Sequence, residues 1–109
     1  MMRLRINGLN WNVQNVQRDD EKLNDKGGNS CFGVTNYQEL VIYLDKSMPR
    51  ELYRQVVIHE LIHAFTFSFG VHLFANEKTE ESVCDFAGAH LDEIYSAANK
   101  IMDFCFKRC

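Results

Sequence analysis

The residues with the clearest chemical potential lie in one apolar stretch, where His59 and Glu60 are followed by His63 in a His-Glu-x-x-His pattern. Histidines four positions apart on a helix lie on the same face, so both imidazoles can reach one tetrahedral metal ion. Glu60 would project beside them, where it can accept a proton from a water held by the metal. The pattern therefore predicts a zinc site with a base next to it.

A catalytic zinc site needs a third protein ligand, and three sources can be compared in this sequence. A third histidine on the same helix would require glycine at position 66 and histidine at position 69, where the chain has Thr66 and Phe69. A di-iron carboxylate site would require a second Glu-x-x-His on another helix, and the sequence contains none. The third source is a downstream helix that places Glu81 and Asp85 on one face, one turn apart.

Turn signals and periodicity predict strands in the first half of the chain. Asn7-Gly8 between two weakly alternating stretches predicts a hairpin over Arg3–Val13, because both residues tolerate positive φ. The polar segment 14–30 is expected to be a short helix or an irregular segment that ends in a loop. Cys31–Asp45 predicts two more strands, of which the second is the apolar run Leu40–Leu44.

Two helices are expected in the second half. Pro49 suits a first helical turn and Gly70 a left-handed stop, which predicts a helix over Arg50–Phe69. The last helix carries an apolar stripe at the three and four spacing of a core face, formed by Val83, Phe86, Ala87, Leu91, Ile94, Ala98, Ile101 and Cys105. Cys84 is expected to serve as a small apolar residue on this packed helix. The possible N-caps are Ser47 for the first helix and Thr79 or Asn76 for the second.

The order of the predicted elements and the length of the chain predict the fold class and the number of domains. Strands followed by helices predict an α+β fold, in which a small N-terminal β-sheet (hairpin plus antiparallel strands) packs against the His-Glu-x-x-His helix and a long C-terminal helix. A chain of 109 residues is expected to form a single domain, 1–109.

The net charge and the hydropathy of the chain limit the classes of binding partner that are expected. Lys and Arg number 12 against 15 Asp and Glu, and this net negative charge disfavours direct binding of nucleic acid through its phosphates. No apolar run approaches the ~20 residues of a membrane span, and the first residues lack the apolar core of a signal peptide. The four cysteines form no C-x-x-C pair. A cytoplasmic protein without a membrane partner is expected.

The histidine motif and the downstream acidic motif together resemble those of a known family. His59–His63 with Glu81–Asp85 resembles the HExxH…ExxxD signature of the gluzincin zinc metallopeptidases. The short length and the strand before the motif are similar to ImmA/IrrE-type metallopeptidases, often found in phages and other mobile elements, and to minimal gluzincins. The resemblance covers roughly Leu40–Asp92. It implies a zincin-like domain, a Zn²⁺ cofactor and a protein or peptide substrate.

The resemblance also implies a role for each matched residue. His59, His63 and Glu81 would be the zinc ligands, with water in the fourth position. Glu60 would be the general base that activates this water and passes its proton to the leaving amine. Asp85 would orient one histidine, most simply His59, by accepting its other N–H.

Some assignments have rivals. Glu80 is a second candidate for the third ligand, and Glu81 is preferred because an aspartate follows it by four positions. By resemblance, Leu40–Leu44 would be the edge strand along which an extended peptide pairs. His90 is interpreted as structural. The candidates for stabilising the oxyanion are His72, Tyr37, Tyr43 and Tyr53.

The sequence thus favours one function over two others. The leading hypothesis is a zinc metalloendopeptidase, a hydrolase that cleaves a peptide bond in a protein substrate with Glu60 as base. The alternative is a zinc-binding, catalytically silent interaction module that is folded like a protease. Glu60 argues against this alternative, because a structural zinc site needs no base beside it. A metal-free helical fold in which the motif arose by chance is the third hypothesis.

Overall fold

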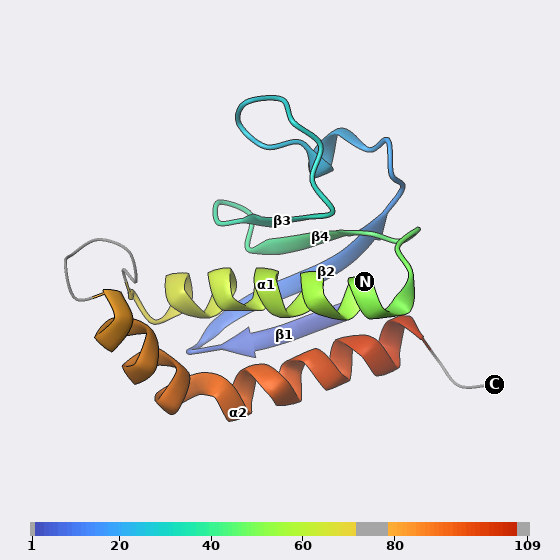
Figure 1. Cartoon of the computed structure of the whole chain (residues 1–109). Helices are drawn as coiled ribbons and strands as arrows, with labels where there is room; N and C mark the ends of the chain where they lie inside the picture. Colours follow the sequence, from blue (N-terminus) through green and yellow to red (C-terminus); the bar gives the residue numbers. More distant parts are fainter. Residues whose placement is uncertain (1, 72–78, 107–109) are drawn as a thin grey trace.

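The computed structural model describes residues 2–71 and 79–106, and for residues 79 and 80 only the backbone. These residues form a mixed β-sheet and two helices, which confirms the predicted α+β class (Figure 1). The elements are β1 (Met2–Ile6), β2 (Leu9–Val16), the single-turn 3₁₀ helix η1 (Glu21–Leu23), β3 (Gly33–Asn36), β4 (Val41–Asp45), α1 (Arg50–Ser68) and α2 (Thr79–Cys105).

The predicted hairpin is formed by β1 and β2. Their antiparallel register runs from Met2 opposite Val13 to Ile6 opposite Leu9. Asn7 and Gly8 make the turn with φ angles of 46° and 83°, the positive values that a tight two-residue turn requires. The hairpin therefore follows from the local sequence, and β2 only extends further than predicted.

β4 is a central strand, which corrects two predictions. The sheet order is β1-β2-β4-β3, and β4 pairs in parallel with β2 and antiparallel with β3. All residues of β4 are buried, as expected for a strand covered on both faces. Leu40–Leu44 is thus not the edge strand, and the strands after the hairpin are not all antiparallel. The edge next to β4 is the short strand β3.

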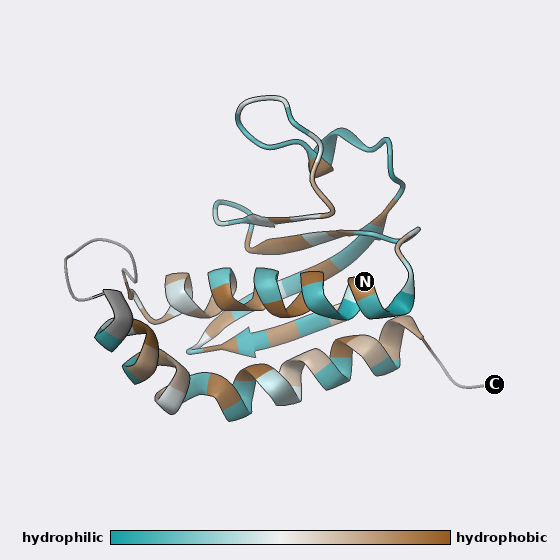
Figure 2. Cartoon of the chain, viewed as in Figure 1, coloured by the Kyte–Doolittle hydropathy of each residue, from teal (hydrophilic) through white to brown (hydrophobic). Residues whose placement is uncertain are grey.

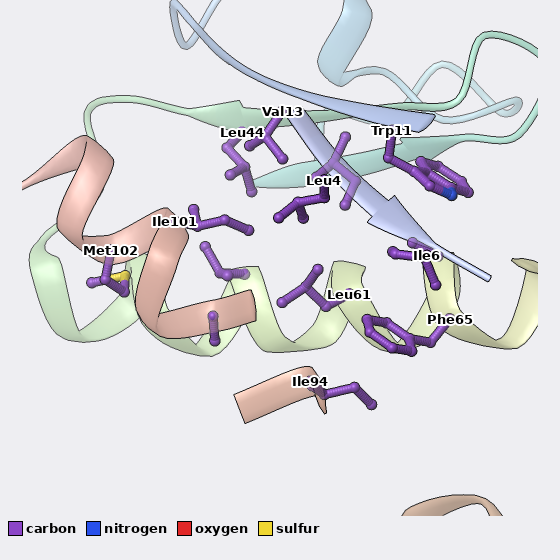
Figure 3. Close-up of a cluster of buried hydrophobic side chains, with 14 of the residues drawn as sticks. Leu4, Ile6, Trp11, Val13, Leu44, Leu61, Phe65, Ile94, Ile101 and Met102 are labelled. Carbon is purple, nitrogen blue, oxygen red and sulfur yellow. The ribbon is translucent and has the colours of Figure 1, made fainter. Parts of the chain in front are cut away.

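The hydrophobic core lies between the sheet and the two helices. α1 packs across the sheet, and α2 packs against α1 and β1. Figure 3 shows side chains from these elements converging, among them Leu4 from β1, Trp11 from β2, Leu61 from α1 and Ile101 from α2. A smaller cluster of Leu23, Val41 and Tyr43 forms a separate apolar group. The segment between β2 and β3 is mainly hydrophilic (Figure 2).

The C-terminal end of α1 is held by the hairpin. The Trp11 indole N–H donates to the Ser68 hydroxyl at 2.8 Å, and the Asn7 side-chain amide donates to the Ser68 carbonyl at 2.9 Å. Gly70 follows with a φ of 66°, which confirms the predicted left-handed stop. These bonds fix where α1 lies relative to β1 and β2.

The N-terminal end of α1 is fixed by Asp45, at the end of β4. Ser47 is not the predicted helix cap, because its hydroxyl and N–H donate to Asp45 Oδ1 at 2.6 and 2.8 Å. Pro49 occupies the N-cap position without a side-chain hydrogen bond. Arg18 donates to Asp45 Oδ2 at 2.9 Å. Burial alone raises the pKa of Asp45, but the bonds from Ser47 and Arg18 outweigh burial and lower it.

α2 begins at Thr79, while the other cap candidate, Asn76, lies outside the described residues. Of the predicted apolar stripe, Phe86, Ile94, Ala98 and Ile101 are buried, whereas Val83 and Leu91 are exposed, which contradicts their predicted place on the core face. Cys84 is exposed, which contradicts its predicted packing role. Within the described residues, neither helix is apolar enough over a sufficient length to cross a membrane.

Folding lowers the pKa of Asp45, so the ionised carboxylate stabilises the folded state. This contribution to the free energy of unfolding is fully present above about pH 3.9, the pKa of an unfolded Asp, and is lost as the pH falls through the lower pKa of the folded state. We expect Asp45→Asn to lower the free energy of unfolding by about 1–3 kcal/mol at pH 7. We also expect it to flatten the loss of stability between about pH 4 and pH 2. Urea unfolding across this pH range measures both effects, with the exposed Asp19→Asn as control. Parallel pH profiles for the wild-type and Asp45→Asn chains would contradict this interpretation.

Candidate metal centre

α1 presents the two motif histidines on one face. His59 and His63 are both exposed, and their ring centroids lie 5.0 Å apart with an angle of 71° between the ring planes. This arrangement follows from the spacing of four residues, which brings side chains one above the other on a helix. The predicted helix and the predicted juxtaposition of the two imidazoles are confirmed.

Glu60 lies beneath this face and is buried, with 5% of its surface exposed. The Thr35 hydroxyl donates to Glu60 Oε1 at 2.8 Å and lies 3.2 Å from the Glu60 carbonyl oxygen. The second carboxylate oxygen, Oε2, lies 3.9 Å from His59 Nε2. One oxygen of Glu60 is therefore anchored to β3, and the other is on the side of the histidine.

Thr35 is a site residue that the sequence analysis missed. A threonine in a short strand is typical of β structure in general, and its contact with Glu60 joins positions 25 residues apart. The sequence carried one signal for this position, which is the alternation of side chains along β3. Gly33 and Thr35 are two positions apart and therefore lie on the same face of the strand.

Gly33 allows β3 to lie this close to α1. A Cβ atom at this position would lie 2.8 Å from Val56 Cγ1 and 2.9 Å from Glu60 Cγ, closer than side-chain atoms pack. Any other residue would therefore push β3 away from α1 or displace Glu60. The glycine serves as a place of close backbone approach to the helix.

Two hollows flank the histidines along α1. The first, of about 350 Å³, has Phe32, Leu52 and Val56 on its walls together with His59 and Glu60. The second, of about 360 Å³, lies towards the end of the helix and is lined by Tyr37, Thr66, Phe67, Gly70 and Val71. A larger hollow of about 420 Å³ lies elsewhere, between β1 and α2, and its lining includes charged residues of both signs but no histidine or cysteine.

Among the candidates for stabilising an oxyanion, Tyr37 is the one whose pKa responds to Glu60. Burial and the negative charge of Glu60 raise the pKa of Tyr37, and its ring stacks on Phe67 with centroids 4.9 Å apart. Tyr53 is buried and hydrogen-bonded to Asn15 and Cys105, and Tyr43 donates to Glu39. His72 lies outside the described residues.

The downstream carboxylates lie on the first turns of α2. Glu81 and Asp85 are both exposed, and Asp85 lines a hollow of about 320 Å³ together with Val71, Phe86 and His90. Within residues 2–71 and 79–106, no three His, Cys, Asp or Glu side chains come together to hold a metal ion. The side chain of Glu80, the rival ligand, lies outside the described residues. Glu81 as third ligand stays a prediction.

His90 packs among aromatic rings, which agrees with its structural interpretation. Its ring centroid lies 4.1 Å from that of Phe69 and 4.9 Å from that of Phe86. Its nearest acidic group in the described residues is Glu93 Oε1, 3.9 Å from Nδ1.

The side chains that α1 supplies are suitable ligands for zinc. Two exposed imidazoles one turn apart are the nitrogen ligands that zinc prefers, and a buried carboxylate lies beside one of them. No known protein family, characterised protein or solved structure matches this chain. The assignment of this site therefore depends on the residues and their geometry.

The close approach at Gly33 can be tested by adding one methyl group. We expect Gly33→Ala to lower the free energy of unfolding by about 1–3 kcal/mol, because the new Cβ overlaps Val56 and Glu60. Gly88→Ala is the matched control, since nothing lies within 4 Å of a Cβ there and alanine favours a helix by about 0.5–1 kcal/mol. Urea unfolding gives both values. A Gly33→Ala chain as stable as Gly88→Ala would contradict the described contact.

Proposed function

We propose that this chain is a zinc-dependent metallopeptidase that hydrolyses a peptide bond in a protein substrate. The observation that supports this most is the position of Glu60, which is buried and held by Thr35 directly beside an exposed pair of histidines. Structural zinc sites are usually closed and rich in cysteine, and they have no use for a carboxylate next to the ligands. A buried carboxylate beside an exposed ligand pair suits a general base.

His59 and His63 would hold the zinc ion through imidazole nitrogens. Glu81 is proposed as the third ligand, and Asp85 as the residue that orients His59 through its second ring nitrogen. This part of the proposal requires the first turn of α2 to face the histidine pair. The identity of the third ligand and the role of Glu60 as base are separate claims, and each needs its own test.

Zinc, when bound, would supply a Lewis acid that lowers the pKa of a coordinated water towards neutrality. Glu60 would take the proton through Oε2, the oxygen on the side of His59, and would later deliver it to the leaving amine. The Thr35 hydroxyl holds Oε1 and so fixes the orientation of the carboxylate. Gly33 allows β3 to lie in contact with Val56 and Glu60.

The free edge of β3 supports an extended peptide as substrate. The Asp45 N–H donates to the Phe32 carbonyl at 2.9 Å, and antiparallel hydrogen bonds recur at every second residue. The peptide groups of Gly33 and Thr35 therefore face away from β4, and no other described strand pairs with them. A peptide that added to this edge would run alongside the histidine face of α1.

Zinc content and hydrolysis test the proposal together. Mass spectrometry of protein purified without chelator should give about one zinc per chain, and His63→Ala should lose it. We expect Glu60→Gln to retain zinc but to cleave a peptide library derived from a digested proteome at least 100-fold more slowly. Glu51→Gln, the same change at an exposed position of α1, is the matched control.

Two results would overturn the proposal. Full activity in Glu60→Gln would remove the base from the mechanism. Zinc bound without cleavage by the unmutated chain would favour the catalytically silent interaction module instead.

A further inference from the structure

We infer that the proposed peptidase selects an extended segment with two bulky apolar side chains four or six residues apart, and that the cleaved bond lies between them. This inference rests on the proposed function and adds its substrate class. It is carried by the two hollows that flank the histidine pair along α1, and by the free edge of β3 that runs beside both.

The chemistry of the two hollows favours apolar side chains. The first is walled by Phe32, Leu52 and Val56, and Glu60 is the one Asp, Glu, Lys or Arg among its lining residues. The second has Tyr37, Phe67 and Val71 on its walls and no Asp, Glu, Lys or Arg among its lining residues. A charged side chain in the second hollow would lose hydration without gaining a partner of opposite charge, and an acidic side chain in the first would lie beside the Glu60 carboxylate.

The three aromatic residues that line the two hollows are exposed. Phe32 is 48% exposed, Phe67 is 46% and Tyr37 is 42%. Phe32 and Tyr37 directly precede and follow β3, so one aromatic ring stands at each end of the free edge. An apolar surface next to unpaired strand groups is suited to burial by a peptide strand, which supplies both backbone bonds and side chains.

The spacing of the hollows sets the spacing of the two side chains. Val56 and Phe67 are eleven positions apart on α1, which is about 16 Å along the helix axis at about 1.5 Å per residue. An extended peptide covers this distance in about five residues at roughly 3.3 Å each. Because side chains alternate along a strand, only an even separation places both on the same face, and the even values next to five are four and six residues.

The histidine pair lies on α1 between Val56 and Phe67. His59 and Glu60 line the first hollow, and His63 lies on α1 between His59 and the second hollow. A segment with one anchor in each hollow would therefore pass beside the proposed base between its anchors. Cleavage should occur between the two anchors, and not outside the pair.

Binding and cleavage test this inference separately. The probes are fluorescein-labelled ten-residue peptides of Ser, Thr and Gln that carry two leucines four, five or six positions apart, or one leucine. Fluorescence anisotropy with the Glu60→Gln chain measures binding without turnover. We expect the four-spaced or the six-spaced peptide to bind at least tenfold more tightly than the five-spaced and single-leucine peptides, because only an even spacing places both leucines on one face.

Variants assign each anchor to its hollow. Phe32→Lys and Phe67→Lys change exposed side chains, and each should abolish the advantage of the second leucine. Leu91→Lys is the control, since Leu91 is 61% exposed on α2 and lines neither hollow. Binding of the five-spaced peptide as tight as that of both even-spaced peptides would overturn the inference, whether or not the chain cleaves them. Cleavage of library peptides that depends on Glu60 but has no apolar preference would also overturn it, and would leave the proposed function in place.

Discussion

The contact on which the site depends is the approach of β3 to α1 at Gly33. Without a side chain at this position, the strand comes close enough to cover Glu60 and to bring the Thr35 hydroxyl to its carboxylate at 2.8 Å. Burying a carboxylate without a hydrogen-bond partner is unfavourable. The glycine that lets β3 cover Glu60 is therefore needed together with the Thr35 hydroxyl that donates to the carboxylate. The exposed histidines acquire a fixed neighbouring base only because this contact exists.

The remaining structure holds α1 in the position that this contact requires. At one end, Asn7 and Trp11 of the hairpin bind Ser68. At the other end, Asp45 accepts bonds from Ser47 and Arg18 just before the helix begins. The core between these points buries the face of α1 opposite to the histidines. The site is thus a rigid helix face whose orientation is set at both ends.

Local features could be predicted from the sequence, and features that join distant residues could not. Asn7-Gly8 predicted the hairpin, and Gly70 predicted the end of α1, because each acts on its own backbone conformation. The central place of β4 depends on pairing with two strands, although its unbroken apolar run was a usable signal. The contact between Thr35 and Glu60 joins positions 25 residues apart, and the alternation along β3 indicated only which face of the strand Thr35 occupies. Glu81 was assigned from spacing and resemblance, which fix its helix but not its neighbours.

The central claim is that His59 and His63 together hold a zinc ion beside Glu60. X-ray absorption at the zinc K-edge of the zinc-loaded chain tests this most directly, because it identifies the atoms bound to the metal. We expect two imidazole nitrogens at about 2.0–2.1 Å with oxygen in the other positions, and no such spectrum in His59→Ala or His63→Ala. Sulfur ligands at about 2.3 Å, or an unchanged spectrum in both histidine variants, would contradict the claim.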